Sequence, residues 1–113
     1  MKIGEQYKCK RLALGMTQAD FADLCGVSSA TISKFERGEF LSQEVYNTIK
    51  ETVERYIRGL DADTYYEIRI VEAALSLQYK NRDQKLRTLS HLMVHVGKLN
   101  MDLLRDAKEE EWP

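Results

Sequence analysis

Proline is missing from the chain until its last position, Pro113. A proline inside a helix removes a backbone hydrogen bond and clashes with the preceding turn, so every earlier residue is free of that break. Glycine is also sparse, with six residues, whereas Leu, Glu, Lys, Arg and Ala, which favour helices, are abundant. The composition predicts an all-α fold. The length of 113 residues predicts one domain, or one small domain with an appended element.

Cysteine is scarce as well. The chain contains Cys9 and Cys25, and their spacing fits neither a CxxC pair nor a zinc site. The sequence has no long apolar run and no signal peptide. We therefore expect two reduced thiols in a cytoplasmic protein that has no membrane segment.

The residue groups that form enzyme active sites are also missing. The sequence shows no nucleophile paired with a base, no cluster of carboxylates, no phosphate-binding glycine loop and no metal-ligand spacing. His91 and His95 lie four residues apart and could geometrically share a metal ion. No third ligand is near them in the sequence, so surface or interface histidines are the simpler interpretation. We predict no enzyme activity, no cofactor and no metal.

An excess of basic residues is absent. The 17 Lys and Arg residues are balanced by 18 Asp and Glu residues, which gives a net charge of −1. Proteins that coat DNA without specificity are basic, because their affinity for phosphates comes from Lys and Arg. If this protein binds DNA, it should use few contacts, be sensitive to salt and need a dimer for tight binding.

The most informative stretch runs from Thr17 to Gly38 and predicts two short helices joined by a tight turn. Thr17 can cap the first helix, with Asp20 bonding back to the cap. Gly26 can take the left-handed conformation that ends a helix sharply, and Ser28 can cap the second helix. The inward-facing apolar residues are Phe21, Ala22, Leu24, Ile32 and Phe35. This pattern predicts a helix-turn-helix.

From about residue 3 to residue 38, the chain resembles the DNA-binding unit of the XRE/Cro/cI-type phage repressor family. The residues that carry the resemblance are Arg11, Leu14-Gly15-Met16, Thr17-Gln18, Ala22, Gly26-Val27, Ile32, Glu36 and Gly38. The resemblance implies a five-helix, lambda-repressor-like domain whose recognition helix enters the major groove of DNA. It also implies that Arg11 and Glu36 form a partly buried salt bridge rather than contacting DNA.

The outer face of the recognition helix carries Ser29, Ala30, Ser33, Lys34 and Arg37. Its short polar groups and lysine are modest readers of base edges. By the resemblance and their exposure, the predicted base contacts are Ser29, Ala30, Ser33 and Lys34. The predicted phosphate contacts are Gln18, Ser28 and Arg37. Lys34 can contact either a base or a phosphate, and the sequence favours neither over the other. The residues assigned to phosphates can also be ordinary exposed side chains.

The chain beyond the resemblance predicts three more helices. Phe40 and Leu41 should close a loop over the core before a helix from Ser42 to about Arg58. A break at residues 59–63 precedes a helix over residues 62–79, whose apolar stripes on two sides predict that it is sandwiched. A last helix, from about residue 83 to at least residue 107, carries a heptad-like seam, which predicts a homodimer interface. The seam consists of Leu86, Leu89, Leu92 or Met93, Val96, Leu99 and Leu103.

Two functions of different classes follow from this organisation. In the first, residues 1–60 bind double-stranded DNA and residues 61–113 form a dimerising helical hairpin. The protein is then a sequence-specific transcriptional regulator, most simply a repressor, which binds an inverted-repeat operator as a homodimer. In the second, the protein is an interaction module, such as an antitoxin, antirepressor or inhibitor, and residues 61–113 hold another protein. The two functions can coexist.

Overall fold

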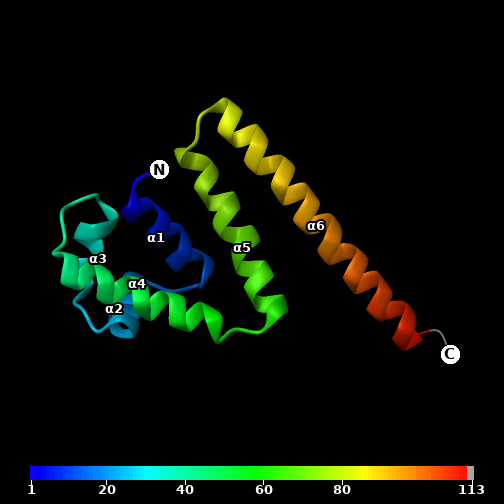
Figure 1. Cartoon of the computed structure of the whole chain (residues 1–113), viewed down its shortest axis with the longest axis horizontal. Helices are drawn as coiled ribbons and strands as arrows, with labels where there is room; N and C mark the ends of the chain where they lie inside the picture. Colours follow the sequence, from blue (N-terminus) through cyan, green and yellow to red (C-terminus); the bar gives the residue numbers. More distant parts are fainter. Residues whose placement is uncertain (112–113) are drawn as a thin grey trace.

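The chain folds into consecutive helices, and no strand occurs in residues 1–111 (Figure 1). The computed structural model describes the backbone of these residues and the side chains of residues 1–98. The elements are α1 (Ile3–Ala13), α2 (Gln18–Cys25), α3 (Ser29–Glu36), α4 (Gln43–Arg58), α5 (Ala62–Ser76), the short 3₁₀ helix η1 (Leu77–Tyr79) and α6 (Arg82–Glu111). The prediction of an all-α fold is confirmed.

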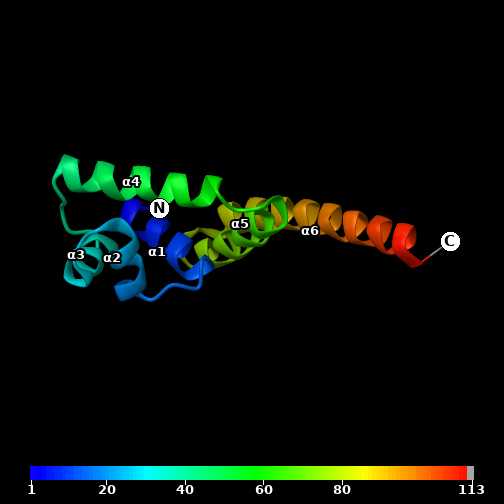
Figure 2. The ribbon, with the colours of Figure 1, turned by 90° about the horizontal axis from the view of Figure 1, so that it is seen from below.

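Helices α1 to α4 enclose the hydrophobic core, with α4 lying along one side of the other three (Figure 2). The buried members of the core are Tyr7, Phe21, Ala22, Cys25, Ile32, Phe35, Ile49 and Val53. Ile32 and Ile49 are 0% exposed, and burial of such a side chain stabilises a fold by about 1.5–3 kcal/mol. This core fixes α3 against its neighbours.

Gly4 allows α1 to lie unusually close to the end of α3. A Cβ atom added at Gly4 would overlap the backbone carbonyl oxygen of Phe35. Any other residue here would push the two helices apart, because the atom in the way belongs to the backbone. The close approach brings the side chains of α1 within reach of the last turn of α3.

Helix α5 lies between α1 and α6 (Figure 1). Ile68 on α5 is buried, and Lys10 Nζ on α1 donates to Glu72 Oε1 on α5 at 2.6 Å. The prediction that this helix is sandwiched is therefore confirmed. Residues 1–60 contain four helices rather than the five expected there, and the fifth helix, α5, is also the first helix of the C-terminal hairpin. Whether residue 60 also separates two folding units stays a prediction.

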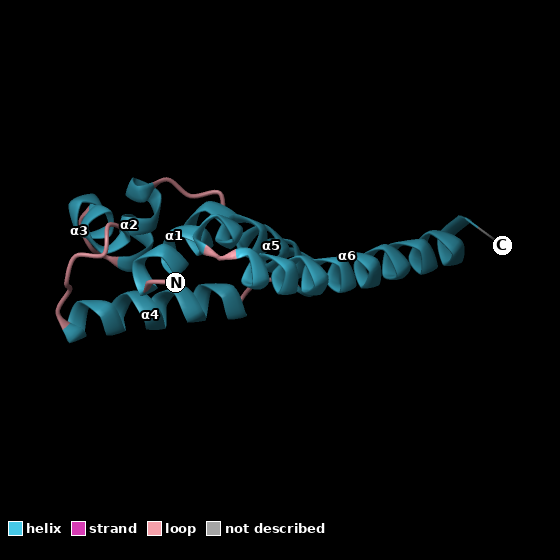
Figure 3. Ribbon diagram, turned by 90° about the horizontal axis from the view of Figure 1, so that it is seen from above, coloured by secondary structure: helices cyan, strands magenta, loops and turns pink. Residues whose placement is uncertain are grey.

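Helix α6 extends away from the other helices (Figure 3). It has 30 residues, which corresponds to a length of about 45 Å. Its first half packs on α5, and the molecule measures 57 × 33 × 20 Å along its principal axes. Within the described part of the chain, no helix combines the length and the apolar character needed to cross a membrane.

The loop between α3 and α4 differs from the prediction. Phe40 is 93% exposed and does not close over the core, whereas its neighbour Leu41 packs against the core. The prediction that Phe40 closes over the core is therefore wrong, and of the two residues only Leu41 packs there.

Candidate nucleic-acid interface

Local hydrogen bonds define the ends of α2. The Asp20 amide donates to Thr17 Oγ1 at 3.1 Å, and the Thr17 amide donates to Asp20 Oδ2 at 3.1 Å. These two bonds form the capping box that the sequence predicted. At the other end, Gly26 has φ 70° and ψ 31°, the left-handed conformation, and the Val27 amide donates to the Ala22 carbonyl at 3.0 Å.

A new helix begins directly after this turn. Ser28 Oγ accepts from the Thr31 amide at 3.1 Å and so caps α3. Ile32 and Phe35 point into the core, and Ala22 on α2 is 2% exposed where the two helices pack. With these residues buried, the opposite face of α3 is held toward solvent.

An ion pair ties the end of α3 to α1. Arg11 Nε and Nη2 donate to Glu36 Oε2 and Oε1 at 2.7 and 2.9 Å, and Arg11 Nη1 donates to the Met16 carbonyl at 2.9 Å. The side chains of Arg11 and Glu36 are 8% and 4% exposed. The fork-to-fork geometry satisfies both charged groups, which is the condition under which a buried pair is tolerated. It fixes the position of α3 relative to α1.

The side chains predicted to contact bases differ in their surroundings. Ser29, Ala30 and Lys34 are exposed on the outer face of α3. Ser33 is partly buried, and its Oγ accepts a hydrogen bond from Arg37 Nη1 at 2.8 Å. The outer face of α3 therefore offers three exposed side chains, Ser29, Ala30 and Lys34, and a Ser33 hydroxyl that Arg37 already engages.

The side chains predicted to contact phosphates all have partners within the chain. Gln18 Nε2 donates to Glu36 Oε1 at 3.1 Å, and Ser28 Oγ also lies 2.9 Å from Thr31 Oγ1. Arg37 Nη2 donates to Glu39 Oε2 at 2.9 Å in an exposed pair. DNA would have to compete with these partners or share them.

Sequence reasoning missed the contribution of Glu39. It places a negative charge next to the predicted phosphate contact at Arg37. The signal was available, because an acidic residue two positions after the arginine is visible in the sequence.

The predicted dimer seam lies partly in solvent and partly in the space between α5 and α6. Leu86, Leu89 and Val96 are 54%, 44% and 41% exposed, and Met93 beside them is 76% exposed. Leu92 lies in the space between α5 and α6 instead. The side chains of Leu99 and Leu103 lie outside the described residues. Three seam residues and Met93 thus form an exposed apolar face, at helical steps of three and four.

His91 and His95 lie on the side of α6 that faces α5 and line a cavity there. Among the residues that the structure describes, no group of three or more His, Cys, Asp or Glu side chains is arranged to hold a metal ion.

A comparison with protein families identifies the N-terminal unit. The family model described as "Helix-turn-helix" matches residues 10–46, which include α2, the turn and α3. No match to the chain was found among curated proteins or among solved structures. The resemblance to XRE/Cro/cI-type regulators is confirmed over this segment, and with it the N-terminal helix-turn-helix.

Proposed function

Residues 10–46 form a helix-turn-helix of the XRE/Cro/cI type, a DNA-binding regulator domain, and from this premise we propose a fuller function. The chain is a transcriptional repressor that binds an inverted-repeat operator as a homodimer in the cytoplasm. Binding at such a site excludes other proteins from the same stretch of DNA.

The exposed face of α3 is the observation that carries this proposal. Ser29, Ala30 and Lys34 are exposed on a helix whose opposite face is buried. The ion pair between Arg11 and Glu36 holds that helix at the surface of the unit. A rigid, solvent-facing helix of this kind is what the major groove of B-DNA admits.

The chemistry of each side chain indicates which group of the DNA it contacts. Lys34 can donate to the O6 and N7 acceptors of guanine, and the methyl group of Ala30 can contact the methyl group of thymine. Ser29 and Ser33 can donate or accept. Gln18, Ser28 and Arg37 fix the register on the phosphates, and Arg37 exchanges Glu39 for a phosphate when DNA binds.

A homodimer is supported by the exposed apolar face of α6. Leu86, Leu89, Met93 and Val96 are each more than 40% exposed in the single chain. Two copies joined along this face bury those side chains. The resulting two-fold symmetry can present two recognition helices to major grooves about 34 Å apart. A chain with a net charge of −1 needs such a pair, because one copy makes few phosphate contacts.

The test is selection of bound sequences from random duplex DNA by the purified full chain at about 0.15 M salt, where non-specific attraction is screened. The expected result is an enriched palindrome whose half-sites lie about one helical turn apart. Enrichment of a single half-site would retain sequence-specific binding and contradict the dimeric mode. Absence of any enrichment would contradict operator binding.

A second candidate function is favoured by the same face of α6. An interaction module, such as an antitoxin, antirepressor or inhibitor, would use the exposed apolar residues to hold a different protein. Sedimentation at tens of micromolar separates the two candidates. A dimer supports the regulator, whereas a monomer that also fails to enrich a DNA sequence supports the interaction module.

A further inference from the structure

A cavity of about 450 Å³ lies between α5 and α6, away from the helix-turn-helix. Its volume is within the range of about 300–1,000 Å³ that is usual for small-molecule sites. The two helices are joined by the turn that follows η1 (Figure 1), and the residues that line the cavity come from α5, α6 and Lys80 of that turn. The cavity therefore belongs to the hairpin.

The lining is rich in hydrogen-bond donors and has no carboxylate. Arg69 and Lys80 supply two cationic groups, His91 and His95 supply two imidazoles, and Tyr66 supplies an aromatic hydroxyl. In the chain as a whole, acidic residues outnumber basic ones by 18 to 17. A lining without Asp or Glu is therefore a local departure from the composition of the chain, and it creates a positive potential in the cavity.

The cationic groups are available to a ligand. The ion pairs found in residues 1–98 are Lys10 with Glu72, Arg11 with Glu36 and Arg37 with Glu39, so neither Arg69 nor Lys80 has a carboxylate partner there. Lys80 Nζ donates to Thr88 Oγ1 at 2.6 Å, and Thr88 is 9% exposed. This bond holds the ammonium group at the cavity and leaves its other protons free to donate.

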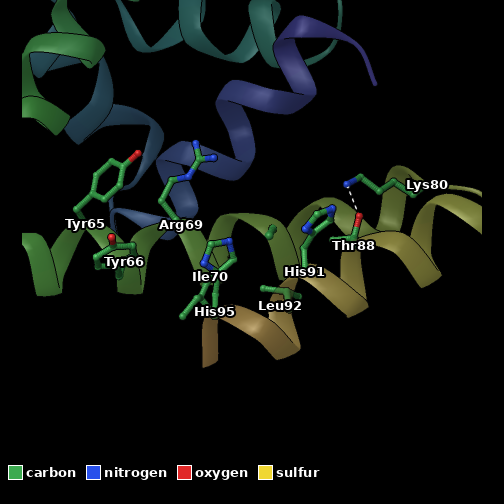
Figure 4. A pocket seen from close by; sticks show the side chains of 10 residues that line it. Tyr65, Tyr66, Arg69, Ile70, Lys80, Thr88, His91, Leu92 and His95 are labelled. Carbon is green, nitrogen blue, oxygen red and sulfur yellow. Dashed lines mark hydrogen bonds between the residues drawn. The ribbon is translucent and has the colours of Figure 1, made fainter. Parts of the chain in front are cut away.

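Figure 4 shows the side chains of His91 and His95 directed from α6 toward α5, whereas the guanidinium group of Arg69 points from α5 toward α1, away from Lys80 and the imidazoles. Ile70 and Leu92 provide apolar surface beside these groups. The ammonium group of Lys80 and the two imidazoles next to this apolar surface suit a ligand that has an anionic group and an apolar or aromatic body.

Dimerisation along the exposed face of α6 would leave this cavity open. Met93 is two residues from both His91 and His95, which corresponds to about 200° around the helix. The face that contains Met93 and the face that lines the cavity therefore point in different directions.

We propose that the cavity between α5 and α6 binds a small organic anion, with Lys80 holding its carboxylate or phosphate group and Arg69 adding to the positive potential. The apolar body of the ligand lies against Ile70 and Leu92. The imidazoles of His91 and His95 add hydrogen bonds. The proposal concerns binding to the protein alone, so it can succeed or fail independently of operator binding.

The test is an NMR titration of the ¹⁵N-labelled full chain with phenyl phosphate at about 0.15 M salt. We expect saturable shifts of amides in residues 65–73 and 88–95. Inorganic phosphate, which lacks the ring, and benzyl alcohol, which lacks the charge, should each bind at least about tenfold more weakly. Equal binding of phosphate and phenyl phosphate, shifts centred on α3, or no saturation by about 10 mM would each overturn the proposal.

Matched variants test the residues. The double variant Arg69→Gln/Lys80→Gln should bind phenyl phosphate at least about tenfold more weakly. The control Lys85→Gln/Arg87→Gln has the same net charge but changes exposed cations outside the cavity, and should bind within about twofold of the unmodified chain. Because loss of Lys80 also removes its bond to Thr88, Ala73→Leu provides a second test. It fills the cavity without changing charge and should abolish binding. Unchanged binding by Ala73→Leu, or equal losses in the two double variants, would show that the anion lies elsewhere.

Discussion

The N-terminal core and the last helix differ sharply in how they cover their apolar residues. Ile32 and Ile49 are 0% exposed, whereas Leu86 and Met93 are 54% and 76% exposed. In the sequence, both regions show apolar residues three and four positions apart. The spacing of apolar residues therefore predicts that a helix face packs against a partner. It does not predict whether that partner lies in the same chain. Four predictions test this difference.

The largest effect on stability is expected at the ion pair of the N-terminal unit. Glu36→Ala leaves the buried guanidinium of Arg11 without its carboxylate and removes the acceptor of Gln18. The free energy of unfolding, measured by urea denaturation, should fall by about 3–5 kcal/mol. Glu39→Ala is the matched control, because it removes the exposed partner of Arg37 and should cost less than about 1 kcal/mol. Equal losses would mean that burial of the pair is unimportant.

The second prediction concerns α5, which lies between the two regions. Cys9 on α1 is 1% exposed and lies outside the core cluster. Burial raises the pKa of its thiol, and the nearby carboxylate of Glu72 on α5 raises it further. Cys25 lies inside the core, where burial raises the pKa of its thiol to about 11. Both thiols should therefore be mostly protonated at pH 8 and react slowly with a disulfide reagent in the full chain.

Truncation after Gly59 should expose Cys9 and leave Cys25 protected. The reaction of Cys9 at pH 8 should then be at least about a hundredfold faster, as measured by thiol kinetics with mass spectrometry to assign the site. Circular dichroism would report whether the shortened chain stays helical. Fast reaction of both thiols would mean that residues 1–59 need α5 to fold, so residue 60 would not be a folding boundary.

The fold was predictable from the sequence where signals are local. Thr17, Gly26 and Ser28 mark the ends of α2 and α3 by the chemistry of their own side chains, and the structure has those ends where the pattern predicted them. The packing of α5 on α1 depends on residues more than 50 positions apart, such as Lys10 and Glu72. No local pattern encodes that contact, although two apolar stripes on one helix indicated that α5 has two partners.

Only part of the candidate site was predictable, again because the sequence shows local spacing and not contacts between distant residues. The outer face of α3 follows from helical spacing, because burying Ile32 and Phe35 determines which residues remain outside. The partners of Gln18 and Arg37 depend on where Glu36 and Glu39 come to lie after folding. The cavity between α5 and α6 depends on the angle between two helices, which their separate patterns do not contain.

The third prediction tests whether the exposed face of α6 is an interface between copies. Met93→Lys places a charge in that face, whereas Val94→Lys changes a residue that is 70% exposed on another side of the same helix. We expect the first variant to raise the dimer dissociation constant at least about tenfold, because it replaces an apolar side chain that the dimer would bury. The second should change it little. Sedimentation equilibrium measures both, and similar effects would exclude this face as the interface.

The last prediction concerns the predicted base contact, where the quantity that matters is the difference between two DNAs. Lys34 is the cation among the predicted base contacts of α3, so Lys34→Ala should weaken binding to the selected operator by about 1–3 kcal/mol and binding to random DNA by less. Gln18→Ala should weaken both by similar amounts, because a phosphate contact carries no sequence information. Titrations with the two DNAs at one salt concentration give the comparison. If Lys34→Ala also weakens both equally, Lys34 contacts phosphate, and the base preference of the protein must come from Ser29, Ala30 and Ser33 or from the shape of the DNA.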